Sequence, residues 1–464
     1  MKNAFFLHNL SVVCRQYNVS MNRVFTTFYF AMTVVVSFGQ EPLSLVQAIE
    51  IGLKNNYQIQ IAERNLEVAQ NSNDWSIAGR YPNVNATLNW NNNFIKSDNP
   101  ASFFPENTSL SSGIVPGLEV TWTLYNGSRV QLTKQQLEQL QRLSEGDVQI
   151  AVENNIQGII LAYYQALVQQ EQLRVREEVL KLSRDRLDYA RVRVEFGQAA
   201  SFDILQSQDA YLNDSTNYLI QKNTLENALR SLNVAMGVDD LSKVYQLTDQ
   251  LEFVVQDYTL ENLKTQMASN NRTLQNLFIA RELAAIGSRI QETALRPQVN
   301  LRLGISDNIN YNIISKQINI NGDERDFGGV RTNAFNTNLG ISMVYNVFDW
   351  GVRKRNIQNA RLGEVVAQLN IEDQKRILNG QLENTFATFN NQRQLVEVTN
   401  QLVANAQRSL AIAEDRLEAG LINVFDYRVV QLSYISAVQS RLTAIYNLKN
   451  TETDLIRLVG GLVR

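Results

Sequence analysis

Histidine and cysteine are almost absent from this sequence of 464 residues, which contains one of each, His8 and Cys14. Both lie in an N-terminal stretch, residues 1–39, that has the features of a targeting segment. Without that stretch the chain has no disulfide, thiolate or imidazole, and we expect neither a metal site nor a cofactor. Phosphate loops of the Gly-Lys-Ser/Thr type and Gly-x-Ser-x-Gly motifs are also missing. The sequence therefore predicts a protein that is not an enzyme.

Strong charge and long apolar runs are missing too. Lys and Arg number 43 against 46 Asp and Glu, for a net charge of −3. No basic block or basic-aromatic patch occurs, so no nucleic-acid partner is expected. Beyond the N-terminus no apolar run reaches the length of a spanning helix, which leaves a membrane β-barrel open because its strands alternate. Acidic pairs such as Glu177-Glu178 lie among Arg and Lys, and we interpret them as solvated ion pairs.

Residues 1–39 are predicted to be a signal peptide with an over-long N-terminus. Met21–Arg23 gives a short basic start, and Val24–Val36 forms an apolar core. Ser37 and Gly39 are the small residues that precede a cleavage site. This pattern predicts that translation begins at Met21, and an N-terminal anchor is the alternative.

Proline is scarce, with six in all, and none falls in two long stretches that share a seven-residue apolar repeat. The stretch Gly351–Leu417 covers 67 residues, and the same repeat occurs 223 positions earlier. The two series are Leu382, Phe389, Val396, Val403, Leu410, Leu417 and Ile159, Ala166, Leu173, Leu180, Leu187, Val194. Such a period is typical of helices that pack along a supercoiled seam. A helix of 67 residues spans roughly 100 Å, so the sequence predicts two duplicated helical rods.

The period changes to two in four shorter segments. Val84–Trp90 and Leu118–Leu124 alternate strictly between apolar and polar residues. Together with their counterparts they predict strands at about 83–94, 117–125, 298–307 and 337–348. Pro82 and Pro297 mark the helix–strand junctions, because proline lacks a donor and restrains the residue before it. The segments between paired strands, 95–116 and 307–336, are expected to be loops.

The chain thus divides into a first repeat at 41–237, a connector at 238–258 and a second repeat at 259–464. Each repeat has a helix, a strand, a loop, a strand, a rod, a turn and a returning helix. The predicted helices other than the rods are 43–79, 202–235, 260–294 and 424–459, with Ser201 as an N-cap. Asparagine pairs, Asn55-Asn56 and Asn270-Asn271, interrupt the first helix of each repeat.

Four strands with one apolar and one polar face indicate a barrel with lipid outside and water inside. Four strands do not close a membrane barrel, since the smallest have eight, so we expect three copies to supply 12. The predicted fold class is mainly α with a membrane β-barrel. A soluble β-meander that caps a coiled coil is the alternative.

The ordered motifs of the two halves carry a resemblance. Arg193-x-x-x-Gly197 is followed by Asp203, and Arg416-x-x-x-Gly420 by Asp426 at the same spacing. With Tyr81-Pro82-x-Val84 and Arg296-Pro297-x-Val299, this set resembles the TolC-like outer membrane efflux protein family over residues 41–464. The resemblance implies a homotrimer in the cell outer membrane, whose 12-stranded β-barrel is continued into the periplasm by a long α-helical barrel.

The same resemblance implies a passive exit duct of a tripartite efflux or type I secretion system. Its partners would be outer-membrane lipid, a periplasmic adaptor protein and an inner-membrane pump. A coiled-coil scaffold of the cell envelope without a pore is the alternative.

The two turns between rod and returning helix are the candidate functional sites. Gly197 and Gly420 are expected to permit the reversal. The candidate adaptor contacts are Arg193, Gly197, Gln198, Arg416, Gly420 and Leu421. Asp203 and Asp426 favour the helix dipole at the start of the returning helices. Alternatively, Asp426 forms a ring of three carboxylates at the periplasmic entrance and binds a blocking cation.

The resemblance implies three further polar or acidic gate positions, and this sequence has Leu417, Ile422 and Val429 there. We therefore expect an apolar constriction to replace part of an ionic lock.

Overall fold

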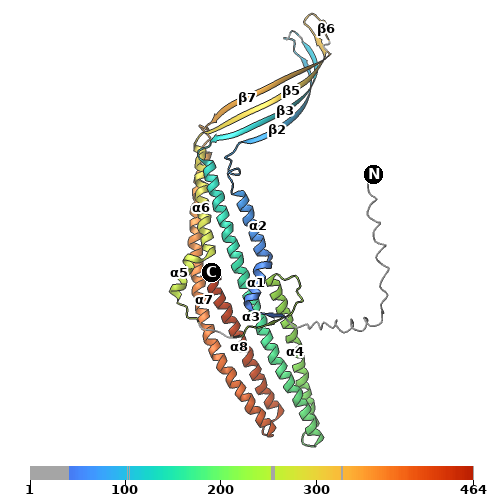
Figure 1. Ribbon diagram of the computed structural model, residues 1–464, viewed down its shortest axis with the longest axis vertical. Coiled ribbons are helices and arrows are strands. Elements are labelled where there is room, and N and C mark those ends of the chain that lie inside the picture. The colour runs from blue at the N-terminus through green and yellow to red at the C-terminus, as the bar shows by residue number, and fades with distance from the viewer. Residues whose placement is uncertain (1–40, 102, 104, 252–255, 326–327, 463–464) are drawn as a thin grey trace, which may run out of the picture.

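The computed structural model describes residues 41–101, 103, 105–251, 256–325 and 328–462. These residues form an elongated, mostly helical molecule with a curved antiparallel sheet at one end (Figure 1). The predicted signal segment, with His8 and Cys14, lies outside the described residues.

The long helices and strands follow one another in the same order in both halves, and the second half adds the short elements η1 and β6. They are β1 Glu41–Leu43, α1 Leu45–Asn55, α2 Tyr57–Ser72, β2 Asn83–Asp98, β3 Glu106–Tyr125, α3 Arg129–Glu195, α4 Ser201–Met236, β4 Tyr245–Leu247, α5 Leu260–Asn270, α6 Arg272–Glu292, η1 Thr293–Leu295, β5 Gln298–Ile318, β6 Glu324–Arg325, β7 Gly328–Val344, α7 Val352–Glu418 and α8 Val424–Leu458. The bounds of α7 are those of α3 shifted by 223 residues, since 352 − 129 and 418 − 195 both equal 223.

The two rods are confirmed to within a residue or two, and each seam packs on its own returning helix. In α7, Leu382, Phe389 and Val396 are buried in one cluster with Leu448 and Leu455 of α8. In α3, Ile159 and Ala166 are fully buried beside residues of α4. The seven-residue repeat therefore joins rod to returning helix within each half.

The apolar core is split in the same way. One cluster unites α1, α3 and α4 with β1 and β4, and a second unites α5 to α8. A smaller cluster crosses between the halves through Val168 and Val175 of α3 and Val438 and Leu442 of α8. In the part of the chain that the structure describes, no helix combines the length and apolar character needed to cross a membrane.

The predicted helix breaks at asparagine are confirmed. The side chains of Asn56 and Asn271 cap α2 and α6, and their amides donate to carbonyls of α4 and α8, 3.4 Å from Ala235 O and 3.0 Å from Leu458 O. The helices predicted at 43–79 and 260–294 end earlier, at Ser72 and Glu292.

The predicted N-cap Ser201 is wrong by one position. Ser201 is the first residue of α4, and Ala200 is the N-cap. The backbone N–H of Ala200 donates to the Asp203 carboxylate at 3.0 Å. The capping oxygen thus comes from the third residue of the helix, where a carboxylate reaches back as in a capping box.

The strands are longer than predicted, and both expected loops are largely wrong. β2, β3, β5 and β7 have 16, 20, 21 and 17 residues, so most of 95–116 and 307–336 is strand. Ladders such as Asn92 opposite Ser112 hold these polar extensions in place. At the other end β7 stops at Val344, short of the predicted 348.

The sheet has the order β2-β3-β5-β7 with antiparallel neighbours, and β6 pairs with the far end of β5. β2 and β7 are its two edges. Along β3 the odd-numbered polar residues from Ser109 to Thr123 are at least half-buried, whereas Leu118, Trp122 and Leu124 are exposed. The sheet therefore shields its polar face and presents its apolar face outward.

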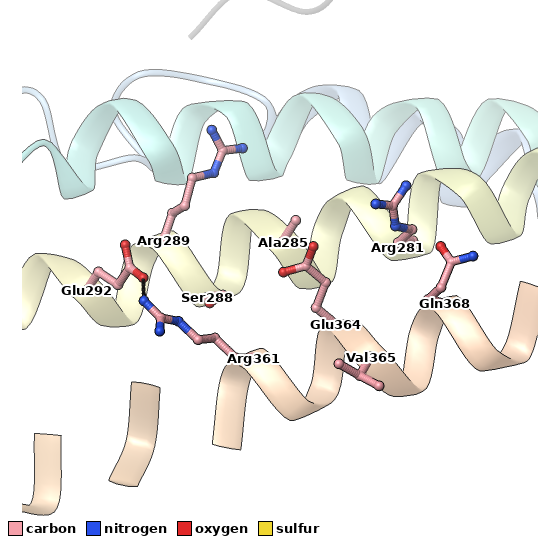
Figure 2. Close-up of a pocket in the computed structure, with 9 residues that line it drawn as sticks. All are labelled: Arg281, Ala285, Ser288, Arg289, Glu292, Arg361, Glu364, Val365 and Gln368. Atoms are coloured by element: carbon pink, nitrogen blue, oxygen red, sulfur yellow. Dashed lines mark hydrogen bonds and ion pairs between the residues drawn. The ribbon is translucent and has the colours of Figure 1, made fainter. Parts of the chain in front are cut away.

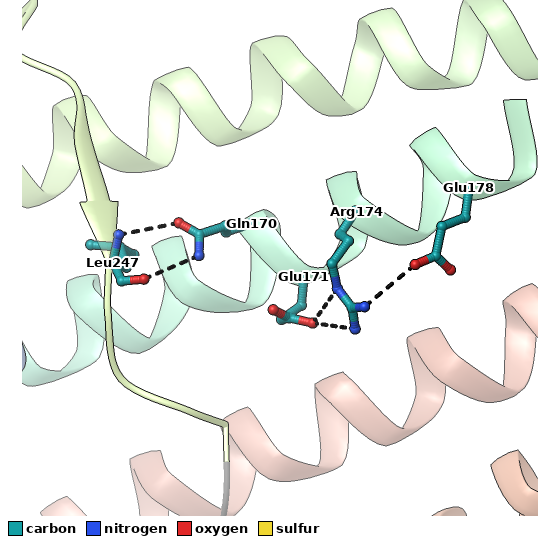
Figure 3. Close-up of polar contacts among 5 residues, drawn as sticks. All are labelled: Gln170, Glu171, Arg174, Glu178 and Leu247. Carbon is teal, nitrogen blue, oxygen red and sulfur yellow. Dashed lines mark hydrogen bonds and ion pairs between the residues drawn. The ribbon is translucent and has the colours of Figure 1, made fainter. Parts of the chain in front are cut away.

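The connector at 238–258 contains a strand that the sequence analysis missed. β4 pairs in parallel with β1, which places the start of the described chain at the middle of the helical body. Figure 3 shows the Gln170 side chain of α3 bonded to both the backbone N–H and the carbonyl of Leu247 at 3.3 Å. Beside it Arg174 pairs with Glu171 and Glu178, as expected for solvated ion pairs.

Candidate functional site

The two rod-to-return turns lie together at the end of the molecule away from the sheet (Figure 1). Gly197 and Gly420 both have φ of +71°. After each glycine a backbone N–H closes the helix end, from Gln198 to Arg193 O and from Leu421 to Arg416 O, at 2.8 Å in both cases. This is the Schellman arrangement, in which a left-handed residue ends the helix, and glycine adopts it without steric cost.

The predicted turn residues differ in their side-chain roles. The Arg193 guanidinium donates to the carbonyl of Gln198 at 3.1 Å and so braces its own turn. Arg416 is exposed. Leu421 is 74% exposed, and Phe425 and Phe202 also stand out from the two turns at 62% and 69%. Both turns therefore carry aromatic or aliphatic side chains with open faces.

Asp203 and Asp426 occupy equivalent positions but have different surroundings. The Asp203 carboxylate caps the backbone of Ala200. In the other turn, the side chain of Asn423 caps α8 by accepting from the backbone N–H of Asp426 at 2.9 Å. Among the described residues no hydrogen bond reaches the Asp426 carboxylate, which is exposed to solvent.

The apolar gate candidates line the second turn. Leu417 is in the last turn of α7, Ile422 lies in the loop, and Val429 is 51% exposed on α8. Pro82 and Pro297 lie at the opposite end of the helical body, directly before β2 and β5.

The halves are joined a little further in, by residues that the sequence analysis did not select. Between the two turns themselves, at 193–203 and 416–429, the described residues form no hydrogen bond or ion pair. Arg428 of α8, however, reaches α4 and donates to both carboxylate oxygens of Asp214, at 2.5 and 2.6 Å. The Ser183 hydroxyl of α3 also donates to that carboxylate. Asp214 is only 2% exposed, so the carboxylate partner of this ion pair is shielded from solvent.

A second contact between the halves lies beside it. The Arg186 guanidinium of α3 stacks 3.2 Å from the ring centroid of Tyr427 on α8 and approaches Glu414 of α7 at 3.5 Å. Burial raises the pKa of the Tyr427 hydroxyl, and burial lowers the pKa of Arg186. A guanidinium over an aromatic face is attracted by the ring quadrupole, more strongly when desolvated.

We call Ser183, Arg186, Asp214, Tyr427 and Arg428 the tip node. It combines three helices (α3, α4 and α8), both halves of the chain and one buried ion pair. Its groups are held in fixed contacts and face one another, which suits a clamp between two helical hairpins. Arginines and carboxylates are common on these helices, so no sequence signal separates the tip node from surface charge.

A groove of about 610 Å³ opens between α6 and α7, closer to the sheet. Figure 2 shows it between the two helices, with Arg361 bonded to Glu292 at 2.6 Å. Arg289 pairs with Glu282 at 3.3 Å on the same helix. The Arg361–Glu292 pair joins α6 to α7, and the groove lies far from the predicted turns.

Comparison with known proteins gives a family. The sequence model described as "Outer membrane efflux protein" matches residues 48–238 and again residues 263–461. No curated protein sequence matches the chain significantly.

Solved structures share the fold at low identity. The CmeC outer membrane channel of Campylobacter jejuni has a TM-score of 0.70 and 16% identity over 90% of this chain and 85% of its own. The outer membrane protein VceC of Vibrio cholerae has a TM-score of 0.67 and 14% identity over 90% of this chain and 96% of its own. The open MtrE channel of Neisseria gonorrhoeae has a TM-score of 0.66 and 18% identity over 90% of this chain and 89% of its own.

Proposed function

The chain belongs to the outer membrane efflux protein family, and from that premise we propose that three copies of it build one export duct. The protein is an outer-membrane efflux channel that extends into the periplasm. A scaffold without a pore is not favoured for a member of this family.

The sheet supports the trimer. Its two outer strands, β2 and β7, present edges, and an open edge in lipid leaves backbone donors and acceptors without partners. Pairing β2 of one copy with β7 of the next gives the backbone donors and acceptors of both edge strands their partners. Three sheets of four long strands then close a barrel of 12 strands, an even number within the range of such barrels.

The exposed side chains agree with lipid outside this barrel. Leu88 and Trp90 of β2 and Leu339 and Ile341 of β7 are each at least 70% exposed in the single chain. Large apolar side chains in such a row need either lipid or a partner surface. Aromatic residues on these strands also suit a membrane interface.

The helical body continues the barrel as a tube. On α7 the neighbouring side chains Leu362, Val365, Val366 and Leu369 are more than half exposed. Ile61 and Val68 of α2 are similarly exposed. Figure 1 shows α2 and α7 on opposite sides of the helical body. We infer that the α2 edge of one copy covers the α7 edge of the next.

Each copy has two repeats, at 41–237 and 259–464, with the connector between them. Each repeat supplies one segment of the wall of this tube. The 223-residue shift between α3 and α7 and the two matches to one family description support that division. Each trimer would then have six long rods.

The turns are the proposed entrance and docking site. Arg193, Gly197, Gln198, Arg416, Gly420 and Leu421 shape two tips whose exposed apolar residues suit contact with a periplasmic adaptor and, through it, an inner-membrane pump. The duct itself is passive, and a drug-efflux pump or a type I secretion pump would supply the energy. Asp426, with its carboxylate free of capping, forms the proposed ring of three at the entrance.

Conductance of the purified protein in a planar bilayer tests the duct. We expect discrete channels and a mass of three chains in mild detergent, and a monomer without conductance would refute the proposal. Asp426→Ala should weaken block by multivalent cations. Asp203→Ala is the matched control, because that carboxylate is engaged in capping, and an equal loss of block in both variants would remove the special role of Asp426.

A further inference from the structure

The polar face of the sheet carries two charged residues, and they are paired with each other. Glu119 of β3 lies opposite Gly304 of β5, and Arg302 lies opposite Thr121, so the two charged residues are diagonal neighbours on one face. Arg302 Nε lies 3.4 Å from Glu119 Oε1. An acid and a base at this diagonal spacing are within reach of each other.

The rest of that face is uncharged over the part of the chain described by residues 83–95, 107–125, 298–314 and 328–344. The register places Asn85, Glu119, Gly304 and Asn338 in one row, and Asn91, Gly113, Asn310 and Thr332 in another. Asparagine side chains fold over the glycines, since a Cβ on Gly304 would meet Asn338 and one on Gly113 would meet Asn310. Apart from Glu119, these two rows consist of amides, a hydroxyl and bare backbone.

We propose that Glu119 and Arg302 set the electrostatic neutrality of the barrel lumen, so that this end of the duct passes solutes without regard to the sign of their charge. The inference rests on the proposed trimeric duct, in which the polar face surrounds water. Three Glu119–Arg302 pairs then lie at one level and cancel. Loss of either partner leaves three like charges at that level of the proposed lumen.

The pair is exposed enough to be changed without loss of the fold. The side chains are 39% exposed for Glu119 and 63% for Arg302, and exposed pairs contribute little to stability. Single-site variants should therefore assemble, which keeps the test interpretable.

The test measures the electrostatic potential at the polar face through the reactivity of an introduced cysteine. In a Cys14→Ser background, Asn85→Cys places a thiol directly opposite Glu119 in the register. Its reaction rates with a trimethylammonium-ethyl and a sulfonato-ethyl methanethiosulfonate, applied to the assembled channel, give a cation-to-anion rate ratio. Leu88→Cys on the apolar face is the control for access.

We expect the ratio in Asn85→Cys to equal that of a free cysteine. Arg302→Gln should raise it at least about twofold, because the unpaired Glu119 carboxylate then lies directly opposite the thiol and acts with opposite sign on the two reagents. Glu119→Gln should lower it by a similar factor. The double variant Glu119→Gln/Arg302→Gln should restore the original ratio.

The outcomes separate the two proposals. Ratios that stay unchanged in both single variants, with Asn85→Cys fully reactive, would overturn the role of this pair and leave the duct intact. A reactive Leu88→Cys beside an unreactive Asn85→Cys would show that the polar face does not surround water. That result would overturn the barrel, and this inference with it.

Discussion

The Arg428 guanidinium donates hydrogen bonds to both carboxylate oxygens of Asp214, with N–O distances of 2.5 and 2.6 Å, although the two residues lie 214 positions apart in the sequence. One residue lies on the returning helix of the second half and the other on the returning helix of the first. The ion pair therefore bonds two hairpins that also meet through the small apolar cluster of α3 and α8 and through Arg186, which contacts Tyr427 and Glu414. It lies two residues from Asp426, so any spreading of the hairpins at the proposed entrance must strain or break it.

Arg428→Gln should destabilise the helical body by about 3–5 kcal/mol, because it leaves the buried Asp214 carboxylate without its cation. Urea unfolding followed by far-ultraviolet circular dichroism measures the change. The double variant Asp214→Asn/Arg428→Gln should lose clearly less, since no buried charge remains. If the double variant is as unstable as the single one, the ion pair is not the source of the effect.

The tip node could not be predicted from the duplication. The position equivalent to Asp214 is 214 + 223 = 437, which is Ala437, and the position equivalent to Arg428 is 428 − 223 = 205, which is Leu205. A comparison of the halves selects residues that repeat, such as the turn glycines, and passes over residues that occur once. The contact depends on how the two hairpins pack, which no local pattern specifies.

The rods were predictable because a single seam of apolar residues persists over nine turns or more, and a repeat of that length rarely arises by chance. The strand ends were not, because asparagine and serine replace the apolar residues there and remove the alternation. Pro116 also argued for a loop. It lies in β3 opposite Leu88, at a point where the β3–β5 register skips Val115 and Pro116, so no ladder donor is lost between those two strands.

Tyr427→Leu should cost about 2 kcal/mol or more, since it removes both a buried ring and the face on which the Arg186 guanidinium rests. Tyr427→Phe keeps that face and should stay within about 1 kcal/mol of the wild type. Chemical unfolding of the two variants under identical conditions gives the comparison. Equal losses in both would assign the contact to the hydroxyl rather than to the ring.

The stability of the helical body should depend on pH through Glu153. This side chain of α3 is only 6% exposed, and burial raises its pKa above the ordinary value of 4.5, although Arg272 and Arg457 oppose the shift. The folded protein therefore holds a proton that the unfolded chain releases. Its contribution is most favourable below pH 4.5 and is lost as the pH rises through the folded pKa.

Glu153→Gln should accordingly be more stable than the wild type at pH 7.5, and the difference should shrink as the pH falls toward 4.5. Thermal unfolding of both proteins at several pH values measures it. Glu177→Gln, on an exposed face of the same helix, is the matched control and should show no such convergence. A constant difference for Glu153→Gln at all pH values would refute the titration as its cause.

Three glycine-to-alanine changes should differ in sign because their backbones differ. Gly420→Ala forces an alanine to φ of +71° and should cost about 1 kcal/mol, although its Cβ has open space. Gly460→Ala has the same strain and drives its Cβ into the Asn270 carbonyl oxygen, so it should cost more. Gly380→Ala lies inside α7 with free space around it and should stabilise the rod by up to about 1 kcal/mol. Unfolding midpoints of the three variants test this order, and an equal loss in Gly380→Ala and Gly420→Ala would contradict it, since the two sites then would not differ by backbone conformation.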